Sequence, residues 1–261
     1  MDDNDFNELL KYFKRPWKGY RKVRKGVIKR LRRHMEELDC TTLEDYIAIL
    51  EQNRTEYQKC QAHLLVTISR FFRDRQVWHH LENRLLPELV SRFPQELKVW
   101  SAGCACGEEP YSLAILWDRL QIQSTLKIIA TDANPLCLER ARKGIFGKSS
   151  LKALSPECIS SCFNRQSAHC YSILPHFQEP ISWYEHDLLD APPQSAFHLI
   201  FLRNNLLTYY QQPTLGRAAE RIGKALMPGG LLVIGAHEKL PELSVSLIRD
   251  NLCPLIYHRI I

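Results

Sequence analysis

Four short apolar runs alternate with helical segments over the last two thirds of this chain, and that alternation limits the fold more than any other feature. The runs cover residues 97–102, 126–130, 198–202 and 231–236. Helical patterns follow the first three runs and begin near Pro110, Pro135 and Pro213. Strands that alternate with helices are typical of a parallel sheet covered by helices. The sequence therefore predicts an α/β domain over residues 95–261.

Two segments of this domain need separate treatment. Residues 146–185 are rich in Ser, Pro and Cys and fit the alternation poorly. They form either an inserted subdomain or a third strand–helix unit with a long decorated loop. Residues 227–230, with the sequence MPGG, predict a turn directly before the last run.

The first 94 residues contain helical patterns and no strand pattern. Apolar side chains between residues 23 and 38 recur at helical spacing and form one face. The sequence from Thr41 to Glu44 reads as a capping box that opens a second helix. Helical pattern continues from about residue 55 to 92, with a break at residues 69–74. We therefore expect a small all-helical N-terminal domain over residues 1–94.

Positive charge is concentrated in this helical part. The chain has a formal net charge of +6, and residues 11–35 carry twelve Lys or Arg and no acidic residue. A basic helix face attracts acidic protein segments, and Arg24, Arg30 and Arg33 are candidates for binding such a substrate. The other interpretations are a solvated helix face and a nucleic-acid site. Nucleic acid is disfavoured because no recognisable reading module accompanies the basic residues.

Composition excludes several classes of protein. No stretch approaches the roughly 18 apolar residues of a membrane-spanning helix, and the N-terminus is acidic where a signal peptide is basic. The nine cysteines have irregular spacing and no CxxC pair, so no metal site is predicted. We expect a cytoplasmic protein with reduced thiols and no membrane insertion.

A glycine-containing turn follows the first predicted strand. Gly103 and Gly107 bracket the turn, and Glu108 and Glu109 open the next helix. Asp132 ends the second predicted strand, where an acid can bind the ribose hydroxyls of an adenosine cofactor. The turn lacks the GxGxxG spacing and the P-loop lysine, and its two acids favour a cationic ligand over a pyrophosphate. S-adenosylmethionine is such a ligand, although a purely structural turn and helix-capping acids remain alternatives.

The segment WSAGCACGEEPYSLAI, residues 100–115, closely resembles the cofactor-binding segment of the CheR family, the chemotaxis receptor glutamate methyltransferases. Five further segments resemble family motifs in the same order. They are ISRFFRD (68–74), ATD (130–132), HDLL (186–189), FLRNNLLTYY (201–210) and MPGGLLVIGAHEKL (227–240). The resemblance implies a Rossmann-like class I S-adenosylmethionine-dependent methyltransferase domain behind the helical domain. It also implies that residues 186–189 belong to a cofactor-contacting strand.

The resemblance assigns a role to each matching residue. Gly103 and Glu108 would hold the methionine part of the cofactor, Asp132 the ribose, and Asp187 and Leu188 the adenine. Three further sets complete the expected site: Thr67, Ser69 and Arg73 over the cofactor, Arg203 and Asn204 on the methionine side, and Arg73 with Tyr209 as catalytic residues.

One departure affects the reacting end of the site. The family commonly has a tyrosine where this chain has Thr208, so an aromatic side chain would have to come from Tyr209 or Tyr210. The expected product is a glutamate methyl ester on an acidic protein, such as the cytoplasmic coiled coil of a receptor. The alternatives are a CheR-like enzyme acting on another protein or a small-molecule carboxylate, and a non-catalytic S-adenosylmethionine-binding or nucleic-acid-binding module.

Overall fold

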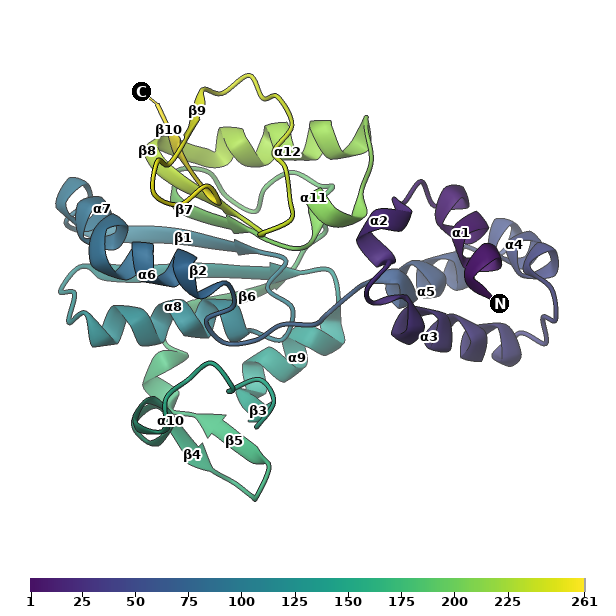
Figure 1. The fold of residues 1–261 in the computed structure, drawn as a ribbon, viewed down its shortest axis with the longest axis horizontal. Helices are drawn as coiled ribbons and strands as arrows, with labels where there is room; N and C mark the ends of the chain where they lie inside the picture. Colours follow the sequence, from purple (N-terminus) through teal and green to yellow (C-terminus); the bar gives the residue numbers. More distant parts are fainter. Residues whose placement is uncertain (261) are drawn as a thin grey trace.

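The computed structural model describes residues 1–260, and its N-terminal part is a compact group of five helices (Figure 1). The helices are α1 (Asp3–Tyr12), α2 (Trp17–Tyr20), α3 (Arg24–Glu37), α4 (Leu43–Gln52) and α5 (Arg54–Leu64). Their apolar faces meet in one cluster that includes Phe6, Leu31 and Tyr46. Helix α4 is capped by Thr42 rather than by Thr41 of the predicted capping box, because the Thr42 side chain accepts the Asp45 N–H at 3.1 Å.

A different core begins after the link formed by residues 65–74. Helix α6 (Arg75–His80), the π-helical turn η1 (Leu81–Leu85) and helix α7 (Leu86–Arg92) pack against the sheet rather than against α1–α5. Phe71 and Phe72 already belong to this second cluster, whereas Leu64 belongs to the first. We therefore propose a division of the chain within residues 65–70 rather than at residue 94.

The C-terminal part is built on a seven-stranded sheet in the order β6-β2-β1-β7-β8-β10-β9. The strands are β1 (Glu96–Ala102), β2 (Thr125–Asp132), β6 (Ile181–Glu185), β7 (Phe197–Leu202), β8 (Leu226–Ile234), β9 (Leu247–Arg249) and β10 (Ile256–Arg259). The pairs from β6 to β8 are parallel, and β10 is antiparallel to both of its neighbours. The predicted α/β architecture is confirmed, and all four predicted strands are present.

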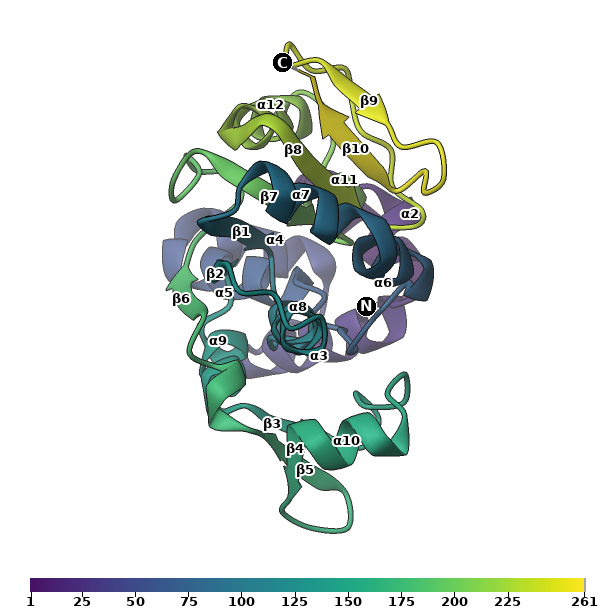
Figure 2. The same cartoon turned by 90° about the vertical axis from the view of Figure 1, so that its left-hand side faces the viewer.

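Both faces of the central strands β1, β2, β7 and β8 are largely buried, which explains why their sequences are mostly apolar. Val99 contributes to the cluster under α6, α7 and α8 (Glu108–Arg119), whereas its neighbour Trp100 contributes to the cluster under α12 (Thr214–Ala225). Helix α9 (Pro135–Lys143) contacts β2 and β6, and the short helix α11 (Leu206–Tyr209) lies beside α12 (Figures 1 and 2).

Two details of the sheet differ from the predictions. Residues 227–230 lie within β8 rather than in a turn, and the pairing of β7 with β8 shifts register opposite them. The predicted strand at residues 186–189 is a loop, because the strand of that unit is β6 and ends at Glu185. Among residues 1–260, no helix is both long and apolar enough to span a membrane.

Residues 146–185 combine both interpretations that the sequence left open. A small antiparallel sheet in the order β3-β5-β4 projects from the domain, and β6 then returns to the main sheet as its third parallel strand (Figure 2). Phe71 of the link packs edge-on against Phe146 and Phe163 of this small sheet. Its elements are β3 (Ile145–Gly147), α10 (Pro156–Cys162), β4 (Phe163–Arg165), β5 (Cys170–Ile173) and the 3-10 turn η2 (Pro175–Phe177).

Candidate active site

The carboxyl ends of β1, β2 and β7 face the helical unit formed by α1–α5 (Figure 1). A cavity at this edge is lined by residues of both parts. In parallel α/β sheets, this edge and the loops that follow the strands form the ligand site. Ten of the predicted site residues line this single cavity. They are Thr67, Ser69, Arg73, Gly103, Asp132, Asp187, Leu188, Arg203, Asn204 and Tyr209.

The turn after β1 is held against the end of β2 by its backbone. The N–H groups of Gly103 and Cys104 both donate to the Thr131 carbonyl oxygen at 2.8 Å. Gly103 has φ +81°, and a Cβ there would lie 2.2 Å from the Asn205 side-chain amide. Glycine is therefore required at position 103, both for the left-handed backbone and for the close approach of the loop after β7.

Asp132, the last residue of β2, holds this turn from the neighbouring strand. Its two carboxylate oxygens accept the N–H of Ala105 at 2.8 Å and the N–H of Asn134 at 2.9 Å. Burial raises the pKa of this carboxyl group, although both backbone donors oppose the shift. Each oxygen keeps a second lone pair, so Asp132 can hold the turn and accept hydrogen bonds from a pair of ligand hydroxyls.

Glu108 was predicted to contact the cofactor, but it does not line the cavity; its neighbour Glu109 does. Successive residues on a helix point about 100° apart, so only one of the two acids at the start of α8 can face the ligand. The Glu108 carboxylate is buried and accepts a hydrogen bond from the Ser150 hydroxyl at 3.0 Å, while its second oxygen has no partner within residues 1–260. Burial raises the pKa of Glu108, despite lowering contributions from Ser150 and Ser69.

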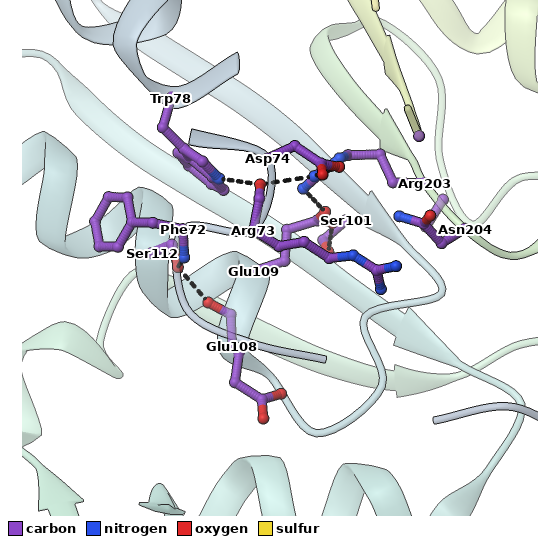
Figure 3. A network of polar contacts seen from close by, with 12 residues as sticks. Phe72, Arg73, Asp74, Trp78, Ser101, Glu108, Glu109, Ser112, Arg203 and Asn204 are labelled. Atoms are coloured by element: carbon purple, nitrogen blue, oxygen red, sulfur yellow. Dashed lines mark hydrogen bonds and ion pairs between the residues drawn. The ribbon is translucent and has the colours of Figure 1, made fainter. Parts of the chain in front are cut away.

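Arg203 is the centre of a buried ion-pair network (Figure 3). Its guanidinium contacts Glu109 at 2.9 Å and Asp74 at 2.7 Å, and it also donates to the Arg73 carbonyl oxygen at 2.8 Å. Glu109 in turn accepts the Ser101 hydroxyl at 2.7 Å. The two acids are held by different nitrogens of one guanidinium, and these contacts fix the link against the strand ends. Arg203 therefore shapes the cavity mainly by holding Arg73 in place.

Arg73 presents its side chain to the cavity from the link. Its guanidinium donates to the Ile68 carbonyl oxygen at 3.1 Å, and its own carbonyl accepts the Trp78 indole N–H at 2.9 Å. No carboxylate within residues 1–260 forms an ion pair with Arg73. A guanidinium that is anchored through its backbone and keeps free N–H groups can bind a carboxylate through two parallel hydrogen bonds.

Thr208, which replaces the expected tyrosine, points into a second polar network. Its hydroxyl donates to Glu238 at 2.6 Å, and the other Glu238 oxygen accepts the N–H groups of Asn204 and Gly235 at 2.9 and 2.7 Å. The neighbouring Tyr209 and Tyr210 both line the cavity. Burial raises the pKa of Tyr209 to about 12, so its hydroxyl is a hydrogen-bond donor at neutral pH.

The helical unit contributes cavity residues that sequence reasoning missed. Tyr20 at the end of α2 lines the cavity, and its ring lies 5.0 Å from that of Tyr209 between centroids. Arg15 donates to the Tyr209 carbonyl oxygen at 3.1 Å and stacks on the Tyr210 ring at 3.5 Å. A Cβ at Gly19 would lie 2.4 Å from the Thr208 carbonyl oxygen, so this glycine permits the contact. No motif in the sequence marks Arg15 or Tyr20 as a site residue, because both reach the cavity through contacts with residues far away in the chain.

The three arginines predicted to bind substrate on α3 lie outside the cavity, and two of them are engaged elsewhere. Arg24 pairs with Asp3 at 2.9 Å, and Arg30 donates to the carbonyl oxygens of His63 and Leu65. Arg30 thereby fixes the end of α5, where the link to the cavity begins. Of these three arginines, only Arg33 is exposed and forms no hydrogen bond to another residue in the range 1–260. A general docking role for the α3 arginines therefore has little support from this geometry.

The chain is similar to several known proteins. Residues 67–249 match the family model described as "CheR methyltransferase, SAM binding domain". A chemotaxis protein methyltransferase of Listeria monocytogenes is 35% identical over 177 residues, which cover 68% of this chain and 67% of that protein. The chemotaxis protein methyltransferase of Salmonella typhimurium is 32% identical over 83% of this chain and 76% of that protein.

A longer relative shows that the same region occurs within a larger protein. An uncharacterized 104.1 kDa protein of Rhodobacter capsulatus is 32% identical over 223 residues, and the matched region spans 83% of this chain but only 23% of that protein. The matched family segment includes the link, the turn after β1, Asp132 and the loop after β7. The chain belongs to the CheR methyltransferase family and carries its S-adenosylmethionine-binding domain.

Proposed function

We propose that this CheR-family methyltransferase forms glutamate methyl esters on an acidic protein acceptor of the chemotaxis-receptor type. The observation that carries the proposal is the position of Arg73, whose guanidinium shares one cavity with the turn after β1 and with Asp132. A carboxylate-binding group thus lies beside the part of the site suited to S-adenosylmethionine.

This reaction requires no general acid or general base from the protein. A glutamate side chain has a pKa near 4.3 and is already a carboxylate at neutral pH. Bound S-adenosylmethionine would supply its methyl group to a carboxylate oxygen, and the electron pair of the broken carbon–sulfur bond would remain on sulfur, giving S-adenosylhomocysteine. No proton moves, so the site needs alignment and exclusion of water rather than a general base.

The residues of the cavity divide this work. Asp132 would bind the ribose, Asp187 and Leu188 would flank the adenine, and the turn at Gly103 would hold the methionine part with Glu109 nearby. Arg73 would bind the acceptor carboxylate. The rings of Tyr209 and Tyr20 would face the sulfonium, which an aromatic face stabilises by cation–π attraction.

Labelled S-adenosylmethionine tests this proposal. The protein is incubated with methyl-labelled cofactor and a purified receptor cytoplasmic fragment, and the product is treated with mild alkali. A glutamate methyl ester releases its label as methanol, whereas methyl groups on nitrogen or sulfur are retained. We expect alkali-labile label on the receptor fragment.

The control is the same fragment with its methyl-accepting glutamates changed to glutamine, which should remove the label. Label on a small carboxylate but not on protein would show that the acceptor of this enzyme is a small molecule rather than a receptor. Calorimetric binding of S-adenosylhomocysteine with no transfer to any carboxylate acceptor would refute the enzymatic role and favour a binding module.

A further inference from the structure

A groove rich in positive charge continues from the cavity onto the outer surface. We name it the basic groove and define it by Arg70, Arg73, Arg75 and Lys152. Ile68, Arg70 and Arg73 line both the groove and the cavity, so the two are continuous. One wall is the link with the start of α6, and the other is the loop after β3.

The walls of the groove are fixed by buried contacts. The Phe71 N–H donates to the Ser150 carbonyl oxygen at 3.2 Å, and the Phe72 N–H donates to the Ser112 hydroxyl at 2.9 Å. Both phenylalanine side chains are buried and underlie the groove. The backbone that carries the charged side chains is therefore already ordered, which reduces the conformational entropy lost when a ligand binds.

The positive charges of the groove are not neutralised within residues 1–260. Its one acid, Asp74, is bound by Arg203, and none of the four basic residues forms an ion pair there. Arg70, Arg75 and Lys152 are exposed. On α3, Arg24 has an acidic partner, and Arg30 and Arg32 donate to backbone carbonyls, as Arg73 and Arg75 do in the groove. The basic groove differs from α3 in that it is continuous with the cavity.

We propose that the basic groove is the docking surface for the acidic protein acceptor, and this inference rests on the proposed function. Acidic side chains next to the reacting glutamate would contact Arg70, Arg75 and Lys152, while the reacting carboxylate passes to Arg73 at the junction with the cavity. Ile68, which is 61% exposed at that junction, offers an apolar contact to the same segment. The groove thus selects a glutamate in an acidic surrounding rather than an isolated one.

Charge reversal at Arg75 and Lys152 tests the proposal without altering the cofactor cavity, which neither residue lines. A glutamate at position 75 suits the N-terminus of α6. The matched control is the double variant Lys29→Glu/Arg33→Glu on exposed positions of α3. The probe is fluorescein-labelled poly-L-glutamate, and its affinity is measured by anisotropy at low salt with saturating S-adenosylhomocysteine. Poly-L-glutamine is the neutral comparison.

We expect Arg75→Glu/Lys152→Glu to weaken poly-L-glutamate binding about tenfold or more, and the α3 control to weaken it less than about threefold. Equal losses in the two variants, a larger loss in the α3 variant, or no binding by the unaltered protein would overturn the proposal. Unchanged S-adenosylhomocysteine affinity in both variants would show that they are folded.

The receptor-fragment assay separates the groove from the proposed function. An increased KM for the fragment with nearly unchanged kcat in Arg75→Glu/Lys152→Glu supports the groove, and an unchanged KM contradicts it. If no carboxylate is methylated by any form of the protein, the proposed function fails, and the anisotropy result alone decides whether the groove binds acidic chains.

Discussion

The active-site cavity has two walls with different origins. The strand-end wall consists of the turn after β1, Asp132 and the loop after β7, and it is set by neighbouring parallel strands. The opposite wall consists of the link 65–74 together with Tyr20 and Arg15, which the helical unit brings from far away in the chain. In the proposed function, the first wall would bind the nucleoside part of the cofactor, and the second would bind the acceptor carboxylate.

Substitutions in the two walls should therefore change different kinetic quantities. Changes in the strand-end wall should act on cofactor affinity, whereas changes in the opposite wall should act on kcat for methyl transfer. The ion pairs of Arg203 join the walls, because Arg203 lies at the end of β7 and holds the link through Asp74 and the Arg73 carbonyl.

The largest effect is expected from Arg73→Ala. Loss of the group that orients the acceptor carboxylate should lower kcat about 100- to 1,000-fold, while the Kd for S-adenosylhomocysteine changes less than about fivefold. Arg73→Lys keeps the charge but not the two-pronged geometry, and it should restore only part of the rate. Single-turnover transfer and calorimetry measure the two quantities. A large loss of cofactor affinity with a normal single-turnover rate would contradict the expectation that the opposite wall acts on methyl transfer rather than on cofactor binding.

Asp132→Asn tests the strand-end wall. Removing a charge-assisted hydrogen bond to the ribose should raise the Kd for S-adenosylhomocysteine about 10- to 100-fold, with a smaller effect on the rate at saturating cofactor. Thermal unfolding of the free protein checks that the turn held by Asp132 persists. Asp190→Asn, in the loop after β6 and outside the cavity, is the matched control. Equal cofactor affinity in both variants would refute the assignment.

Tyr20→Leu tests whether the helical unit takes part in transfer. The ring that would face the sulfonium is lost, so we expect kcat to fall about three- to tenfold with unchanged cofactor affinity. Tyr20→Phe keeps the ring and should retain nearly the full kcat. Tyr57→Leu in α5 removes a ring from the same unit outside the cavity and should leave kcat unchanged. If Tyr20→Leu and Tyr57→Leu behave alike, Tyr20 is only a core residue.

The smallest effect is expected from a substitution of Glu108, which is buried beside the strand-end wall and does not line the cavity. Because the pKa of Glu108 is raised in the folded protein, its ionisation lowers stability as pH rises above the unfolded value near 4.5. Glu108→Gln should therefore increase the free energy of unfolding by about 1 kcal/mol at pH 7. That gain should disappear below about pH 4, where the glutamate is neutral in both states.

Glu109→Gln is the matched comparison and has the opposite expected sign. It removes a charged partner of the buried Arg203 and should destabilise the protein at pH 7. Chemical denaturation at several pH values measures both variants. A destabilised Glu108→Gln at neutral pH would show that the buried carboxylate has a compensating partner.

The sequence by itself determined the strand-end wall. Apolar runs identified β1, β2, β7 and β8, and parallel strands necessarily bring their carboxyl ends to one edge. Gly103 and Asp132 could be placed at this edge because each lies directly beside a strand in the chain. The strand of the third parallel unit was expected at residues 186–189 rather than at β6, and β9 and β10 were missed. β6 and β9 are edge strands with exposed residues, and β10 has only four residues, so their apolar patterns are weak.

Only the tertiary structure decided which charged and aromatic side chains reach the cavity. Adjacent glutamates on α8 point in different directions, so the choice of Glu109 over Glu108 depends on how the helix is rotated against the sheet. Tyr20 and Arg15 enter through contacts with Tyr209, which lies 189 and 194 positions away in the chain. Arg30 stays exposed, but its guanidinium donates to carbonyl oxygens at the end of α5. Local patterns fix the strands and their end loops, whereas packing between distant elements fixes where a side chain points.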